Sequence, residues 1–101
     1  MIALLGERFD ARTAEEIGLV NRVVSAAALD GEVTQLATRL AAGPTRAYAR
    51  TKELLNTSFD HNLATHLGWE CDRFVASTAT ADFAEGVTAF VEKRPPKFEG
   101  R

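Results

Sequence analysis

The chain has 101 residues, and its 12 lysine and arginine residues against 14 aspartate and glutamate residues give a formal net charge of -2. This length fits one domain with a thin core, the balanced charge argues against attraction to nucleic acids, and no apolar run reaches the roughly 18 residues that span a membrane. The single cysteine, Cys71, cannot form an intramolecular disulfide, so we expect a reducing compartment, the cytoplasm.

Helical patterns and their end signals dominate the first part of the chain. Residues 1–5 have the composition of the last turns of a helix. Asp10 is a suitable N-cap for a second helix over 11–17, which Gly18 ends. Residues 19–24 are rich in β-branched side chains, which predicts a short extended segment.

Four further stretches carry apolar residues at helical spacing, which predicts amphipathic helices. In chain order these residues are Leu29, Val33, Leu36 and Leu40; Tyr48, Thr51, Leu55 and Phe59; Leu63, Leu67, Cys71, Phe74 and Val75; and Phe83, Val87, Phe90 and Val91. Pro44 suits the first turn of the second of these helices. The sequence therefore predicts an all-α fold: a single helical domain over 1–101, built as a small bundle of amphipathic helices with one short extended segment.

Trp69 does not follow the apolar stripe of its own helix. At 100° per residue it falls on the face opposite Leu63, Leu67 and Phe74. Two interpretations stay open. The ring packs under a neighbouring loop, or it belongs to a surface that meets another subunit or a further part of the protein.

No pattern in the sequence predicts a catalytic residue or a metal site. His66 and Glu70 are one turn apart, but no third ligand is spaced to join them, which favours an ion pair or a hydrogen bond. Cys71 falls on an apolar stripe, which predicts a buried small hydrophobe rather than a nucleophile. Asp82 and Glu85 fall in an early helical turn, where acidic groups suit the helix dipole.

The end of the chain is its most specific segment. Residues 80–100 read T-A-D-F-A-E-G-V-T-A-F-V-E-K-R-P-P-K-F-E-G: a capped helix, a proline stop and a basic, aromatic tail. This segment closely resembles the C-terminal signature of the crotonase (enoyl-CoA hydratase/isomerase) family. The G-E-R-F-D-A…G-L-V-N-R-V-V passage over 6–24 and the two predicted helices over 36–55 resemble the same family, in the same order and spacing.

The resemblance implies a longer protein. In this family an N-terminal ββα spiral holds the active site, and a helical C-terminal region mediates trimer assembly. Two backbone N–H groups of the spiral polarise the thioester carbonyl of an acyl-CoA, and two acidic residues serve the hydratases. All of these groups are expected upstream of Met1, so the chain is expected to be an inactive C-terminal fragment.

The resemblance further implies that the complete protein hydrates or isomerises enoyl-CoA thioesters in fatty-acid metabolism, with coenzyme A as part of the substrate and no covalently bound cofactor. We expect this chain to form a homo-oligomer, a dimer or larger. The alternative is a free-standing helical self-association module with no ligand and no catalysis.

By the same resemblance, Phe90 and Lys93 approach the adenine and phosphate end of CoA bound to a neighbouring subunit. A ring offers stacking and a lysine offers a mobile positive charge. Helical periodicity instead favours a core position for Phe90. The basic residues near the end of the chain either meet phosphates or complement the negative end of the last helix; they are Lys93, Arg94, Lys97 and Arg101.

Overall fold

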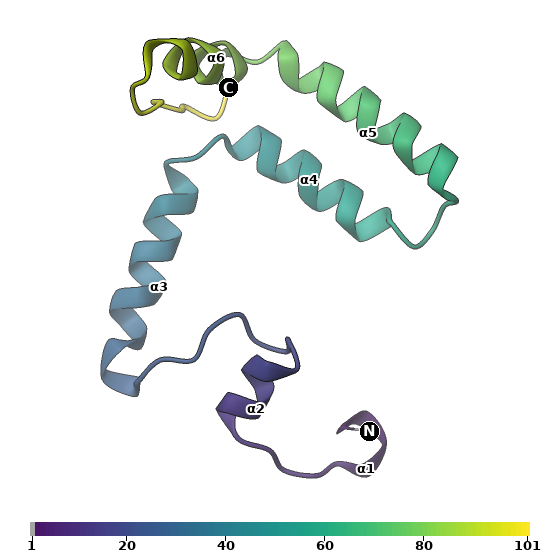
Figure 1. Ribbon diagram of the computed structural model, residues 1–101, viewed down its shortest axis with the longest axis vertical. Helices are drawn as coiled ribbons and strands as arrows, with labels where there is room; N and C mark the ends of the chain where they lie inside the picture. Colours follow the sequence, from purple (N-terminus) through teal and green to yellow (C-terminus); the bar gives the residue numbers. More distant parts are fainter. Residues whose placement is uncertain (1) are drawn as a thin grey trace. The chain divides into compact units, whose positions relative to one another are not determined.

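The computed structural model describes the backbone of residues 2–101 and the side chains of residues 4–101 (Figure 1). This part of the chain contains helices and no strand, which confirms the all-α prediction. The helices are α1 (Ile2–Leu5), α2 (Ala11–Glu16), α3 (Ala26–Ala41), α4 (Thr45–Thr57), α5 (Leu63–Thr78) and α6 (Ala81–Glu92). None of them is long and apolar enough to cross a membrane. Of the predicted first helix, Met1 lies outside the described residues.

The chain divides into two compact units, Met1–Thr34 and Gln35–Arg101. In the first unit Asp10 is the N-cap of α2, as predicted, and its carboxylate accepts a hydrogen bond of 2.8 Å from the Thr13 amide. That bond holds the pKa of Asp10 below its ordinary value. The expectation of a single domain over the whole chain stays a prediction.

The segment after α2 differs in part from the predicted extended run over 19–24. Gly18 has φ +74°, and the chain then turns back so that the amides of Leu19 and Val20 both donate to the Ala14 carbonyl, at 2.9 and 3.3 Å. The carbonyls at the end of a helix lack partners within the helix, and this turn supplies two donors to one of them. Within and after the predicted segment, only residues 22–25 are free of turns, bends and helix.

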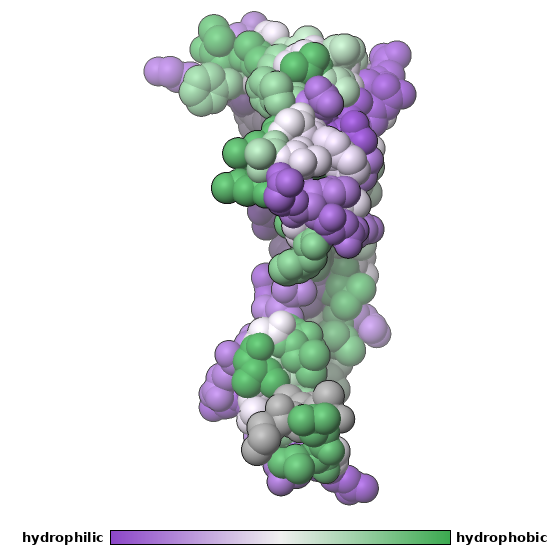
Figure 2. Space-filling view, turned by 90° about the vertical axis from the view of Figure 1, so that its right-hand side faces the viewer, coloured by the Kyte–Doolittle hydropathy of each residue, from purple (hydrophilic) through white to green (hydrophobic). Residues whose placement is uncertain are grey.

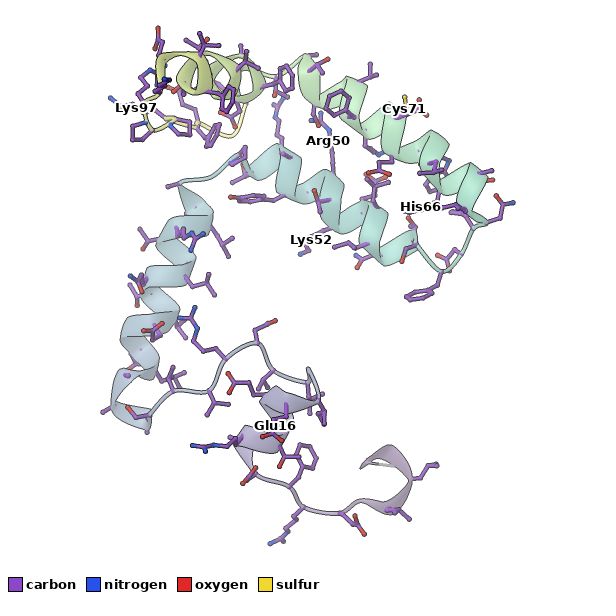
Figure 3. The ribbon with its side chains drawn as sticks, viewed as in Figure 1. Glu16, Arg50, Lys52, His66, Cys71 and Lys97 are labelled. Carbon is purple, nitrogen blue, oxygen red and sulfur yellow. The ribbon has the colours of Figure 1, made fainter. Side chains whose placement is uncertain are left out.

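In the second unit α4 and α5 form an antiparallel helical hairpin (Figure 1). Arg73 of α5 donates two hydrogen bonds to the Glu53 carboxylate of α4, at 2.9 and 2.5 Å. Near the other end of the hairpin, Arg50 of α4 donates to the Ser77 hydroxyl of α5 at 3.0 Å (Figure 3). These two contacts fix which turns of the helices face each other.

Trp69 is half-buried against the loop that precedes its helix. Its ring lies 4.3 Å from the ring of His61, centroid to centroid, with an edge-on angle of 60° between the planes. Edge-on aromatic pairs of this kind stabilise a fold by more than the burial of their apolar area accounts for. Of the two interpretations left open by the sequence, the contact supports packing against a neighbouring loop.

The last helix and the tail that follows it are joined by polar contacts. Thr80 caps α6, its hydroxyl accepting from the Phe83 amide at 3.1 Å. At the other end Lys93 has φ 54° and ψ 38°, a left-handed C-cap, and Pro95 and Pro96 prevent the helix from resuming. The tail then returns alongside α6 (Figure 1), where the carboxylates of Asp82 and Glu85 accept hydrogen bonds from tail amides.

The described part of the chain has little core of its own. Its buried apolar residues are Ala14 and Ala89, and none of its large side chains is fully buried. Phe59 is 98% exposed and Phe90 is 86% exposed. Hydrophobic residues are exposed beside hydrophilic ones on the face drawn in Figure 2. The apolar faces predicted from helical periodicity are therefore present but uncovered.

The hydrogen bonds between Glu85 and the tail predict that the attachment of the tail to α6 depends on pH. Hydrogen bonds from Arg94 and from the Lys97 amide lower the pKa of Glu85 from 4.5 to about 2. A carboxyl whose folded pKa is lowered stabilises the folded state above its unfolded pKa, and that contribution is lost as the pH falls through the folded value. We expect the NMR chemical shift of the Lys97 amide to change as the pH falls from about 4.5 to 2. A Glu85→Gln chain is the control and lacks the transition; a midpoint at the ordinary pKa in the unsubstituted chain contradicts the assignment.

Candidate functional site

An apolar cavity of about 370 Å³ lies in the second unit, where the first turn of α4, the end of α5, α6 and the tail meet. Most of its wall is hydrocarbon, and the main apolar contributors are Pro44, Ala47, Phe83, Val87, Phe90 and Phe98. Polar groups enter the wall from Arg46, Ser77, Thr80 and Asp82. Such a wall suits an apolar or aromatic group with a few polar atoms.

Phe90 is exposed in this chain rather than part of a core. Helical periodicity correctly places it on the apolar stripe of α6, but its side chain is 86% exposed and lines the cavity. The prediction of a core position was wrong for the described residues, because none of them covers this face of α6. An exposed aromatic ring beside a cavity is available for stacking.

Lys93 lies just beyond the end of α6, whereas Phe90 lies within it. The helix ends at Glu92, and Lys93 turns the chain in the left-handed region. The Lys93 amide still donates to the Phe90 carbonyl at 3.3 Å, so the two residues remain neighbours across the helix end. The lysine side chain is exposed and forms no ion pair with the described residues.

The other basic residues of the tail differ in how they are neutralised. Arg94 pairs with Glu85 and with Glu92, both at 2.6 Å, and these hydrogen bonds raise its pKa above the ordinary value. Arg101 pairs with Glu99 at 2.6 Å. Lys97 lies on the exposed side of the tail (Figure 3) and, like Lys93, has no carboxylate within ion-pair distance in the described part of the chain. The lysines are thus better placed than the arginines to meet a phosphate.

Asp82 and Glu85 have a role that the sequence interpretation missed. Both were assigned to the helix dipole, yet Asp82 is only 5% exposed and Glu85 forms a two-bond ion pair with Arg94. A signal for this role was present: two acidic residues one turn apart, followed by a proline-stopped tail with free amides. An interaction with the helix dipole can be inferred from the local sequence alone. The hydrogen bonds to the tail instead join residues up to 18 positions apart, as between Asp82 and Gly100.

The remaining candidates from the sequence do not converge on a site. The prediction of a buried Cys71 was wrong: the thiol is exposed, and it points away from α4 (Figure 3), because the apolar stripe of α5 lacks a cover among the described residues. His66 has a buried Nδ1 with no hydrogen-bond partner in the described residues. No group of three metal-ligating side chains occurs within them.

Comparisons with known proteins identify the family. The model of the enoyl-CoA hydratase/isomerase family matches residues 1–101. A probable enoyl-CoA hydratase of Mycobacterium tuberculosis is 39% identical over 100 residues, which are 99% of this chain and 39% of that protein. The 1,2-epoxyphenylacetyl-CoA isomerase of Escherichia coli K12 is 37% identical over 100 residues, 99% of this chain and 38% of that protein.

Solved structures agree with the sequence comparison. An enoyl-CoA hydratase from Polaromonas sp. JS666 matches with a TM-score of 0.86 and 36% identity, covering 93% of this chain and 37% of that one. The chain thus spans 37% to 39% of the length of these three proteins. Since the family match extends over every residue, the chain belongs to the enoyl-CoA hydratase/isomerase, or crotonase, family.

Proposed function

We propose that this chain serves as the helical assembly region of an enoyl-CoA hydratase/isomerase protein and contributes one edge of its CoA site. The complete protein would hydrate or isomerise enoyl-CoA thioesters in fatty-acid metabolism in the cytoplasm. The observation that carries the proposal is the family match over residues 1–101, in a chain that spans 39% of a hydratase relative. The catalytic groups that the family resemblance implies would then come from outside this chain.

Assembly is supported by the exposed apolar faces. On the apolar stripe of α5, Leu67 and Phe74 are each more than half exposed. The same is true of Val87 and Val91 on the stripe of α6. Large contiguous apolar surfaces on a soluble protein usually mark contacts with another protein surface. We infer that these faces are covered in a homo-oligomer, a trimer in the family and a dimer or larger for this chain.

A contact with CoA is supported by the pairing of Phe90 with Lys93. The exposed ring suits stacking on a purine, and the exposed lysine beside it suits a phosphate. The remaining alternative is a helical module that associates with itself and binds no ligand. The uncovered apolar faces fit both proposals equally, so CoA binding distinguishes them.

The first prediction of this proposal concerns catalysis. The chain alone is expected to hydrate crotonyl-CoA no faster than buffer, because an oxyanion hole and paired acids supply most of the rate in this kind of reaction. The rate of hydration is measured by the loss of the enoyl absorbance, with an active full-length enoyl-CoA hydratase as positive control. Turnover that survives repurification of the 101-residue chain would place a catalytic site within it.

The second prediction concerns assembly. Val87→Asp puts a charge on the apolar stripe of α6 and is expected to raise the dissociation constant of the oligomer at least about tenfold, since burying an unpaired charge is costly. Thr88→Asp, an exposed neighbour off the stripe, is the matched control and should change little. Light scattering over a dilution series provides the measurement. A chain that is monomeric at all concentrations would contradict the proposal.

The third prediction concerns CoA. Lys93→Gln is expected to weaken CoA binding roughly two- to fivefold, since an exposed charge contributes little, and the difference should shrink as salt rises. Lys52→Gln removes the same charge from an exposed position on α4, outside the tail, and is the control. Calorimetric titration of each chain measures the affinities. Absence of CoA binding by the unsubstituted chain at millimolar concentration would favour the self-association module.

A further inference from the structure

We propose that Asp82 and Glu85 are positioning residues: together they form a carboxylate clamp that holds the tail over 94–101 along α6, and thereby fixes Phe98 at the cavity and Lys93 at the end of α6. Only the consequence for CoA rests on the proposed function. The clamp itself follows from the contacts of α6 with the tail and is tested separately.

Asp82 holds the far end of the tail. Its carboxylate accepts from the Glu99 amide at 2.7 Å and from the Gly100 amide at 2.9 Å, one on each oxygen. In return the Asp82 amide donates to the Arg101 carbonyl at 3.0 Å. That amide lies in the first turn of α6, where backbone donors have no partner within the helix. A buried carboxylate and a helix-end amide therefore bind three successive tail residues.

Glu85 holds the near end. It lies one turn further along α6 and accepts from the two terminal nitrogens of Arg94, at 2.6 and 2.8 Å. The same carboxylate accepts from the Lys97 amide at 2.7 Å. Charge-assisted bonds to a carboxylate are stronger than neutral ones, and the paired geometry with arginine also fixes orientation. The tail is thus bound at two points by carboxylates that α6 holds at a fixed spacing.

Phe98 lies between these two anchors in the sequence. Its ring forms part of the cavity wall, and a Cβ added to Gly86 would be 3.6 Å from it, so the ring packs closely on the backbone of α6. Beyond it, Gly100 has φ +74° and passes so near Thr45 that an added Cβ would lie 2.6 Å from the threonine hydroxyl. The clamp therefore also sets where the tail meets α4.

Lys93 is held between fixed neighbours. On one side α6 ends, and on the other the Arg94 amide donates to the Ala89 carbonyl at 3.0 Å while its side chain is bound to Glu85. Lysine avoids the left-handed region that Lys93 occupies, and glycine is the usual residue at such a helix end. The clamp supplies the restraint that keeps Lys93 in this conformation.

Amide hydrogen exchange on the full 101-residue chain tests the clamp. Glu85→Gln is expected to speed exchange of the Lys97 amide at least about tenfold, and Asp82→Asn to do the same for the Glu99 and Gly100 amides, since each loses a charge-assisted hydrogen bond. Glu92→Gln is the matched control. It removes the same charge from α6 and a contact to the same Arg94, but Glu92 binds no tail amide. Unchanged protection in both clamp variants, with α-helix content preserved, would overturn the proposal.

Lys93→Gly tests the restraint on Lys93. Relief of the left-handed lysine is expected to raise the melting temperature by about 4 °C or more in a chain of this size. Lys93→Gln, which keeps a side chain in the same conformation, should leave the melting temperature unchanged. An unchanged or lower value for Lys93→Gly would show that the clamp imposes no strain there.

The consequence for CoA is tested by a double substitution. If Glu85 acts through Lys93, Glu85→Gln and Lys93→Gln should each weaken CoA binding. The double variant should then bind CoA with about the same affinity as the single variant that binds it less tightly. Additive losses would show that Glu85 does not position Lys93. If the unsubstituted chain binds no CoA, the proposed function fails, whereas the clamp still stands or falls on the exchange rates and the melting temperature.

Discussion

The structure depends above all on apolar helix faces that the described residues do not cover. Helices of 12 to 16 residues are marginal in water by themselves and gain most of their stability by burying one face. Here the buried apolar residues of the described part are two alanines, Ala14 and Ala89. Under the proposed function, another copy of the chain or a further part of the protein covers these faces, and assembly and folding are then coupled.

Polar contacts determine the local geometry where a core is lacking. Asp10, Asn62 and Thr80 cap three of the helices, and Glu53 and Arg73 align the hairpin of α4 and α5. Exposed ion pairs contribute little to stability because water and salt screen them. Their effect here is on specificity: they select one register of helix against helix and of tail against helix, while leaving the apolar faces open.

The sequence predicted what is local. Helix periodicity and capping residues identified the helices, because both signals lie within a few residues of the feature they specify. Periodicity also showed which faces of α5 and α6 are apolar, but not what covers them, so Phe90 and Cys71 were wrongly expected to be buried. The clamp by Asp82 and Glu85 was missed because it joins α6 to a tail whose return path no local pattern specifies. The cavity was missed for the same reason.

The contact between His61 and Trp69 gives this chain an internal optical reporter. Trp69 is the single tryptophan, so all indole emission comes from one site. Its ring contacts a residue of the loop joining α4 to α5, at a centroid distance of 4.3 Å. Emission intensity and wavelength therefore report on the closure of that loop on α5. Fluorescence can separate opening of the hairpin from events at α6 and the tail without any added label.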